Sequence, residues 1–152
     1  LRAGPIRSLR GEMLLALAGH VDACVDHRAT LVAMETVKAL GEALPLVMGA
    51  VTRGEFFAVE GLRIFGQTKP SEMARKHDYT VREHVGVAGP IAASNTPIAN
   101  IATKFHPALT TGDSVVVKIA ATTPATSAAV RRLAVSTGFL VGAVNVGHGG
   151  LN

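Results

Sequence analysis

The stretch that decides the fold spans residues 85–124 and reads VGVAGPIAASNTPIANIATKFHPALTTGDSVVVKIAATTP. It begins with an apolar run, VGVAGPI, which predicts a buried strand. The polar triplet at residues 94–96 then precedes Pro97, a combination typical of a helix start, because proline has no amide hydrogen to leave unbonded there. We expect this helix to continue to Thr111 and to end at Gly112, a residue type favoured just after a helix.

A second unit of the same kind follows directly. Residues 114–119, SVVVKI, are apolar and rich in β-branched side chains, as in a central parallel strand. Pro124 opens a further helix that is expected to end at Gly138, and residues 143–146 predict the third strand. This βαβαβ order predicts an α/β fold with a Rossmann-like parallel sheet, half of a doubly wound domain.

Asn95 follows the first predicted strand and Lys118 lies at the end of the second, at the carboxyl edge where open α/β sheets bind nucleotides. Asn95 either caps the next helix or donates its amide to a ligand, and both uses together stay open. Lys118 cannot remain buried without a partner, so it must emerge at the edge, toward solvent or toward a ribose or phosphate. The sequence has no G-x-G-x-x-G turn and no P-loop, so a nucleotide would not rest on a glycine cradle.

The chain before this unit is expected to be a helical lead-in, residues 7–66. Apolar residues recur there at helical spacing, and Pro45 suits the first turn of a third helix. Residues 67–79 show no periodicity and predict a loop. An exposed strand is expected at Thr80–Val85, where polar and apolar residues alternate, so that residues 80–152 comprise this strand and the βαβαβ unit.

Composition narrows the possible functions of these 152 residues. The net charge is +4, but the basic residues are scattered without interleaved aromatic residues, so nucleic acid is not an expected partner. No apolar run reaches the roughly 18 residues of a membrane span, and the six histidines lack metal-ligand spacing, so neither a membrane nor a metal is expected. The single cysteine, Cys24, excludes an internal disulfide and fits a cytoplasmic location. We expect it to be a packed core thiol.

From Arg82 onward the sequence resembles the aldehyde dehydrogenase superfamily. The family pattern R-E-x-V-G-V-x-G, N-x-P, P-A-L-x-x-G, V-V-x-K-x-A-x-x-T-P and G-x-V-N-V occurs here in that order. A weaker match precedes it, since residues 35–39, ETVKA, are similar to an E-T-G-K-P segment with Val for Gly and Ala for Pro. The resemblance covers nearly the whole chain. It implies that residues 1–152 are part of the NAD(P)-binding domain of an enzyme that oxidises an aldehyde to a carboxylate.

The resemblance also implies roles for individual residues. The amide of Asn95 would stabilise the oxyanion formed when a cysteine thiolate attacks the aldehyde, an interaction worth roughly 3–4 kcal/mol. Lys118 would bond the adenosine ribose. The remaining cofactor contacts would come from Ile91, Ala92, Ala93, Ser94, Ala120, Ala121 and Gly149. The family's nucleophilic cysteine and general base lie later in its sequences, so this chain alone is expected to be inactive.

Position 121 departs from the family pattern. Many members have a glutamate there, which bonds both ribose hydroxyls and would repel a 2′-phosphate. Ala121 removes that repulsion and leaves Lys118 nearby, so the expected cofactor is NADP or NAD, with NADP bound at least as well; a plain small loop residue is the alternative reading. Lys104 matches a helix lysine of a proton-exit chain in some members, but a solvated lysine is favoured.

Two other readings stay open. The chain could be a truncated, non-catalytic protein that acts by association, or part of a CoA-acylating aldehyde dehydrogenase. The expected partners are an aldehyde substrate and further copies of the chain, paired through the exposed strand near Thr80–Val85 to give a homo-oligomer.

Overall fold

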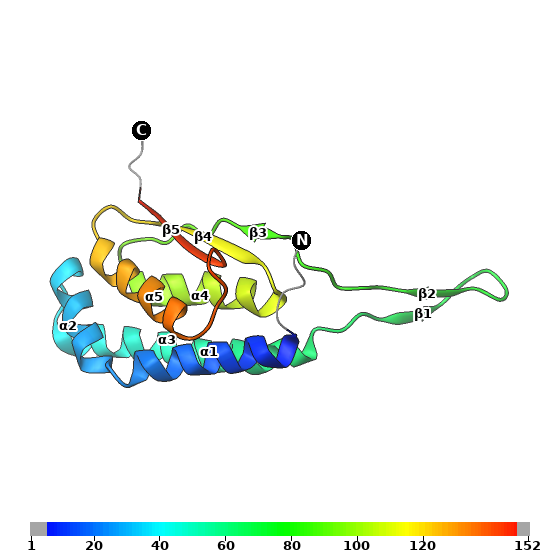
Figure 1. The fold of residues 1–152 in the computed structure, drawn as a ribbon, viewed down its shortest axis with the longest axis horizontal. Helices are drawn as coiled ribbons and strands as arrows, with labels where there is room; N and C mark the ends of the chain where they lie inside the picture. Colours follow the sequence, from blue (N-terminus) through cyan, green and yellow to red (C-terminus); the bar gives the residue numbers. More distant parts are fainter. Residues whose placement is uncertain (1–5, 149–152) are drawn as a thin grey trace.

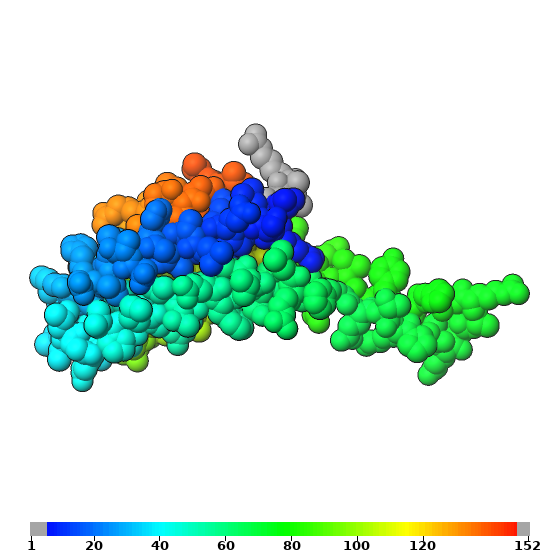
Figure 2. Space-filling model, turned by 90° about the horizontal axis from the view of Figure 1, so that it is seen from below, coloured from blue at the N-terminus to red at the C-terminus, as the bar shows by residue number. Residues whose placement is uncertain are grey.

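The computed structural model describes residues 6–148, which begin with a layer of helices. The helices are α1 (Arg7–Asp22), α2 (Val25–Thr36) and α3 (Leu40–Glu60), followed by a 3₁₀ turn at Gly61–Arg63. Figure 2 shows α1 and α3 side by side along the body of the molecule. They can approach closely because Gly11 has no Cβ. A Cβ at this position would lie only 2.7 Å from the carbonyl oxygen of Ala58. The predicted helical lead-in is therefore confirmed.

The details of α3 differ from the prediction. Pro45 lies inside the helix rather than in its first turn, because the helix already begins at Leu40. The buried face of α3 consists of small or β-branched residues, while larger apolar side chains such as Met48 and Phe56 are exposed. Cys24 is also exposed, between α1 and α2, so the expected packed thiol is wrong.

An arm extends from the body after α3 (Figure 1). It contains two short antiparallel strands, β1 (Thr68–Pro70) and β2 (His77–Tyr79), with Thr68 opposite Tyr79. The expected loop at residues 67–79 therefore contains a hairpin, which the sequence hides because all six strand residues are exposed and carry no apolar alternation. The strand expected at Thr80–Val85 is wrong, since these residues belong to no strand.

The second half of the chain forms a parallel sheet in the order β3-β4-β5: β3 (Val87–Ala88), β4 (Ser114–Ile119) and β5 (Val144–His148). The connecting helices α4 (Pro97–Thr111) and α5 (Pro124–Ser136) lie together between the sheet and the layer of α1 and α3 (Figure 1). The α/β fold with a Rossmann-like βαβαβ unit is confirmed. Gly112 ends α4 with a φ of 97°, as expected of a left-handed cap.

Among residues 6–148, helices cover only one face of this sheet. Along β4, Val115, Val117 and Ile119 are at most 1 % exposed and pack toward the helices, whereas Val116 between them is 44 % exposed. Side chains alternate between the two faces of a strand, so Lys118 shares the open face with Val116. Within residues 6–148, no helix has the length and apolar character needed to cross a membrane.

Candidate functional site

The structure brings the first predicted junction next to Lys118. Ile91 forms an isolated parallel bridge with Lys118 beyond the end of β3. The amide of Ala92 donates to the carbonyl oxygen of Lys118 at 2.9 Å, and the amide of Lys118 donates to that of Pro90 at 2.8 Å. These backbone bonds fix the start of the segment 91–95 against the carboxyl end of β4, as the proposed cofactor site requires.

Asn95 is held by a second asparagine that sequence reasoning missed. The Nδ2 of Asn100, in the first turns of α4, donates to Oδ1 of Asn95 at 3.1 Å and to the carbonyl oxygen of Ala93 at 3.4 Å. Because the oxygen of Asn95 is engaged, its own NH₂ group is the end left to donate, and it has no protein partner among residues 6–148. The spacing N-x-P-x-x-N is the sequence signal that could have identified Asn100.

Asn95 is not the cap of α4. The residue at the N-cap position is Thr96, and within residues 6–148 no side chain makes a capping bond to the first turn of the helix. Of the two roles considered for Asn95, the structural one is therefore wrong, and the exposed amide at the carboxyl edge of the sheet remains.

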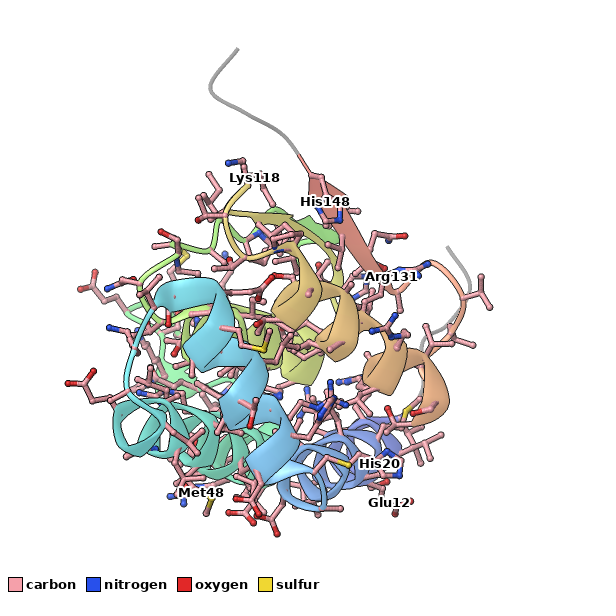
Figure 3. The ribbon with its side chains drawn as sticks, turned by 90° about the vertical axis from the view of Figure 1, so that its left-hand side faces the viewer. Glu12, His20, Met48, Lys118, Arg131 and His148 are labelled. Atoms are coloured by element: carbon pink, nitrogen blue, oxygen red, sulfur yellow. The ribbon has the colours of Figure 1, made fainter. Side chains whose placement is uncertain are left out.

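The second junction joins β4 to α5 and carries the other predicted residues. Lys118 is half-buried near the end of β4, and Ala120 and Ala121 follow in a tight turn in which the amide of Thr123 donates to the carbonyl of Ala120 at 3.2 Å. Figure 3 shows Lys118 and His148 near each other at the top of the view, on the opposite side of the molecule from Glu12. Gly149, also predicted here, lies outside the described residues.

Lys104 is exposed on α4, which agrees with the favoured reading of a solvated helix lysine. Its Nζ also donates a hydrogen bond to the carbonyl oxygen of Ile91, thirteen residues earlier, so it joins α4 to the segment that precedes Asn95.

Glu35 is a further residue at this edge for which sequence reasoning predicted no role. Its carboxylate accepts hydrogen bonds from the amides of Ala125 at 2.7 Å and Thr126 at 2.9 Å, and from the hydroxyl of Thr126. The partners are about ninety residues apart in the sequence, so no local pattern could have revealed the contact.

A cavity of about 1010 Å³ lies at the opposite, amino-terminal edge of the sheet, where Gly86, Asp113 and Ser114 are among its lining residues. The carboxylate of Asp113 accepts from the amide of Gly86 at 2.7 Å and from the hydroxyl of Thr111 at 2.8 Å, so its polar oxygens are engaged in the fold. We do not place the candidate site there, because ligands of open α/β sheets bind at the carboxyl ends of strands.

Titratable groups add little to the site itself. Burial lowers the pKa of His106, in the middle of α4, to about 4, although a backbone hydrogen bond with Ala102 opposes this shift. No cluster of three or more metal-ligating side chains occurs within residues 6–148. The described part of the site therefore offers one amide donor, one cation and a lining of small residues.

These features fit a dinucleotide. Lys118 supplies a positive charge at the end of β4, three residues before exposed Ala121. Ala93 is exposed with only a methyl group, whereas Ala92 is 5 % exposed and belongs to the core. No acidic side chain follows Lys118 in the turn before α5, so the turn itself carries no charge that would repel an additional phosphate.

The sequence and structure were compared with known proteins. The model of the aldehyde dehydrogenase family matches residues 6–151. Over 121 residues the chain is 37 % identical to a succinate-semialdehyde dehydrogenase (NADP(+)) of Escherichia coli, and the match covers 80 % of this chain and 25 % of that protein. The chain thus spans about a quarter of the length of this relative.

Solved structures of other proteins have the same fold as this chain. An E. coli NADP-dependent enzyme superposes with a TM-score of 0.94 at 32 % identity, covering 97 % of this chain and 31 % of that one. Betaine aldehyde dehydrogenase from Staphylococcus aureus, in complex with NAD+, superposes with a TM-score of 0.92 at 28 % identity, covering 96 % and 29 %.

Proposed function

The chain belongs to the aldehyde dehydrogenase family, and from that premise we propose that it forms the cofactor-binding portion of an NAD(P)-dependent enzyme that oxidises an aldehyde to a carboxylate. The observation that supports this most directly is the arrangement of Asn95 and Lys118. Asn95 follows β3 and Lys118 lies near the end of β4, two neighbouring parallel strands that are tied together at Ile91 and Ala92.

Each residue would have a distinct task. The NH₂ group of Asn95 would donate to the aldehyde oxygen as negative charge develops on it, and Asn100 holds the amide in the orientation that presents this donor. Lys118, Ala120 and Ala121 would face the adenosine ribose, while the backbone from Ile91 to Ser94 would line the nicotinamide. When bound, the nicotinamide supplies the hydride acceptor.

The nucleophile would come from outside residues 1–152. Cys24 is the only cysteine, and it lies between α1 and α2 rather than at the carboxyl edge of the sheet. We therefore expect the isolated 152-residue chain to show no aldehyde-dependent reduction of either cofactor.

The relatives suggest where to look for a substrate. Curated relatives include enzymes for succinate, aspartate and glutarate semialdehydes, each an aldehyde carried on a carboxylate chain. Succinate semialdehyde is thus the first compound to test.

We also propose that the complete protein is a homo-oligomer in the cytoplasm. The arm with β1 and β2 extends away from the body, and its Tyr79 is 73 % exposed. An isolated two-stranded hairpin is only marginally stable, so this arm is better suited to pairing with another copy than to remaining alone. The single exposed thiol, Cys24, is compatible with a reducing compartment. Sedimentation of the complete protein and of a version lacking residues 68–79 would test the arm's role; identical assembly states would contradict it.

The decisive experiment measures NADPH and NADH formation by the full-length gene product with succinate semialdehyde and with an unsubstituted aliphatic aldehyde. Cofactor reduction that depends on aldehyde supports the proposal. Binding of either cofactor without turnover on any aldehyde would contradict the catalytic part while leaving the binding part intact. Added CoA should not be required for product formation.

A further inference from the structure

A carboxylate from the helical lead-in bonds the first turn of α5. Glu35, in the last turn of α2, accepts from the amides of Ala125 and Thr126 at 2.7 and 2.9 Å, one with each carboxylate oxygen. The hydroxyl of Thr126 donates to the same carboxylate. Thr126 is 2 % exposed and Glu35 is half-buried, so the contact is shielded from solvent on one side.

This contact bonds two helix amides that no residue closer in the sequence bonds. The first turn of a helix has amide hydrogens without helical partners, and a negative charge is favourable beside them. Pro124 has no amide hydrogen to offer, and the side chain of Thr123 at the N-cap position makes no capping bond. Glu35 therefore does for α5 what a local cap does in most helices.

The contact also fixes the loop that precedes α5. Residues 120–123 connect β4 to α5, and their first end is held by pairing of β4 on both sides. Glu35 holds the other end at Ala125 and Thr126. Burial of Thr123 and the bond from the hydroxyl of Ser127 to the carbonyl of Thr123 also hold this end, and Glu35 adds the only bonds that reach it from the helical lead-in among those the described residues make.

We propose that Glu35 is a positioning residue for the cofactor, a proposal that rests on the function proposed above. By bonding the first turn of α5 it would steady the turn in which Ala120 and Ala121 follow Lys118, the residues that would face the adenosine ribose. Glu35 touches no ligand itself. Its effect therefore falls on cofactor affinity and on the order of the α5 start, and not on the chemical step.

The test compares Glu35→Gln with Glu12→Gln in the full-length gene product. In Glu35→Gln the side chain keeps its length but presents an NH₂ group to an amide donor, so one bond is lost and the negative charge disappears. Glu12 is an exposed carboxylate on α1, on the opposite side of the molecule from Lys118 in Figure 3.

Two measurements are needed. Fluorescence titration with NADPH and with NADH should show the Kd of both raised about five- to tenfold in Glu35→Gln, which corresponds to about 1–1.4 kcal/mol. Hydrogen exchange without cofactor should show faster exchange in the first turn of α5. In turnover, KM for the cofactor should rise with Kd while kcat stays within about twofold, because the chemical step does not involve Glu35. Glu12→Gln should change none of these.

The outcomes separate this inference from the proposed function. Faster exchange at α5 with unchanged Kd would show a purely structural contact and overturn the inference alone. A wild-type protein that binds neither NADPH nor NADH would overturn both. If Glu35→Gln does not fold, Thr126→Val removes only the hydroxyl donor, and a Kd increase of about twofold is expected; an unchanged Kd would count against the inference.

Discussion

Two helices begin at the carboxyl edge of this sheet, α4 after β3 and α5 after β4, and each begins with threonine followed by proline. At α5 the carboxylate of Glu35 occupies the first turn. At α4 no side chain bonds the first turn, and Asn95 just before it presents an amide. The same local sequence thus makes one closed junction, suited to holding a loop, and one open junction, suited to meeting a substrate.

The largest expected effect is at the open junction. Replacing Asn95 with alanine in the full-length gene product should lower kcat by about 10²–10³-fold, because the donor to the developing oxyanion is lost. Steady-state kinetics with saturating cofactor would measure it. Asn100→Ala should lower kcat less, since it only frees the orientation of Asn95. Equal activity of Asn95→Ala and wild type would show that the open junction does not meet the reacting oxygen.

At the closed junction the expected effect is on cofactor choice. The 2′-phosphate of NADP carries about two negative charges, so Ala121→Glu should shift the ratio of affinities toward NAD by about tenfold. Titration of both cofactors would measure the ratio. Ser136→Glu adds the same charge at the far end of α5 and serves as the control. If both variants leave the ratio unchanged, position 121 does not select the cofactor.

Acid should disturb α4 more than α5, because α4 carries the buried His106. Its pKa in the folded protein is lowered to about 4, so the unfolded chain binds the proton more readily as pH falls below about 6.5. The free energy of unfolding should therefore decrease by on the order of 1–2 kcal/mol between pH 7.5 and 5.5 from this group. Urea titrations at both pH values would show a smaller decrease in His106→Leu. The same decrease in the variant would exclude His106 as the cause.

The smallest expected effect is on the free energy of unfolding, at the residue that follows the end of α2, two positions after Glu35. Val37 has a φ of 55° and is 94 % exposed, and a β-branched residue in this left-handed conformation costs roughly 1–2 kcal/mol. Val37→Gly should raise the free energy of unfolding by about 0.5–1 kcal/mol, after the greater entropy of glycine in the unfolded chain is deducted. The exposed Val141 has no positive φ, so Val141→Gly should destabilise instead. Thermal melts of both variants would decide.

The sequence predicted what local chemistry controls. Pro97, Gly112 and the run at 114–119 mark the βαβ unit without reference to the rest of the chain, and the unit is present as expected. The hairpin was missed because its exposed strands have no apolar pattern. The buried face of α3 carries small residues because its neighbours pack closely against it; a Cβ on Gly54 would lie 3.0 Å from the Cβ of Ala18.

The site was predicted to the extent that it follows strand ends. Asn95 and Lys118 lie where parallel strands place them. Asn100 and Lys104 were not identified as supports, since their contacts depend on how α4 turns relative to the segment before it. The contact of Glu35 with α5 could not be predicted from the sequence, because only the packing of α2 against α5 brings a residue ninety positions away to this turn.

The open face of the sheet bears on how such a protein is made on the ribosome. The relatives are three to four times as long as this chain, whereas the helices that cover the other face all belong to residues 7–136. This side can pack early in translation, while Val116 and Val87, 44 % and 66 % exposed, lie on a face that nothing within residues 6–148 covers. A nascent chain paused at that stage would expose an apolar strand surface, the kind of surface that chaperones bind.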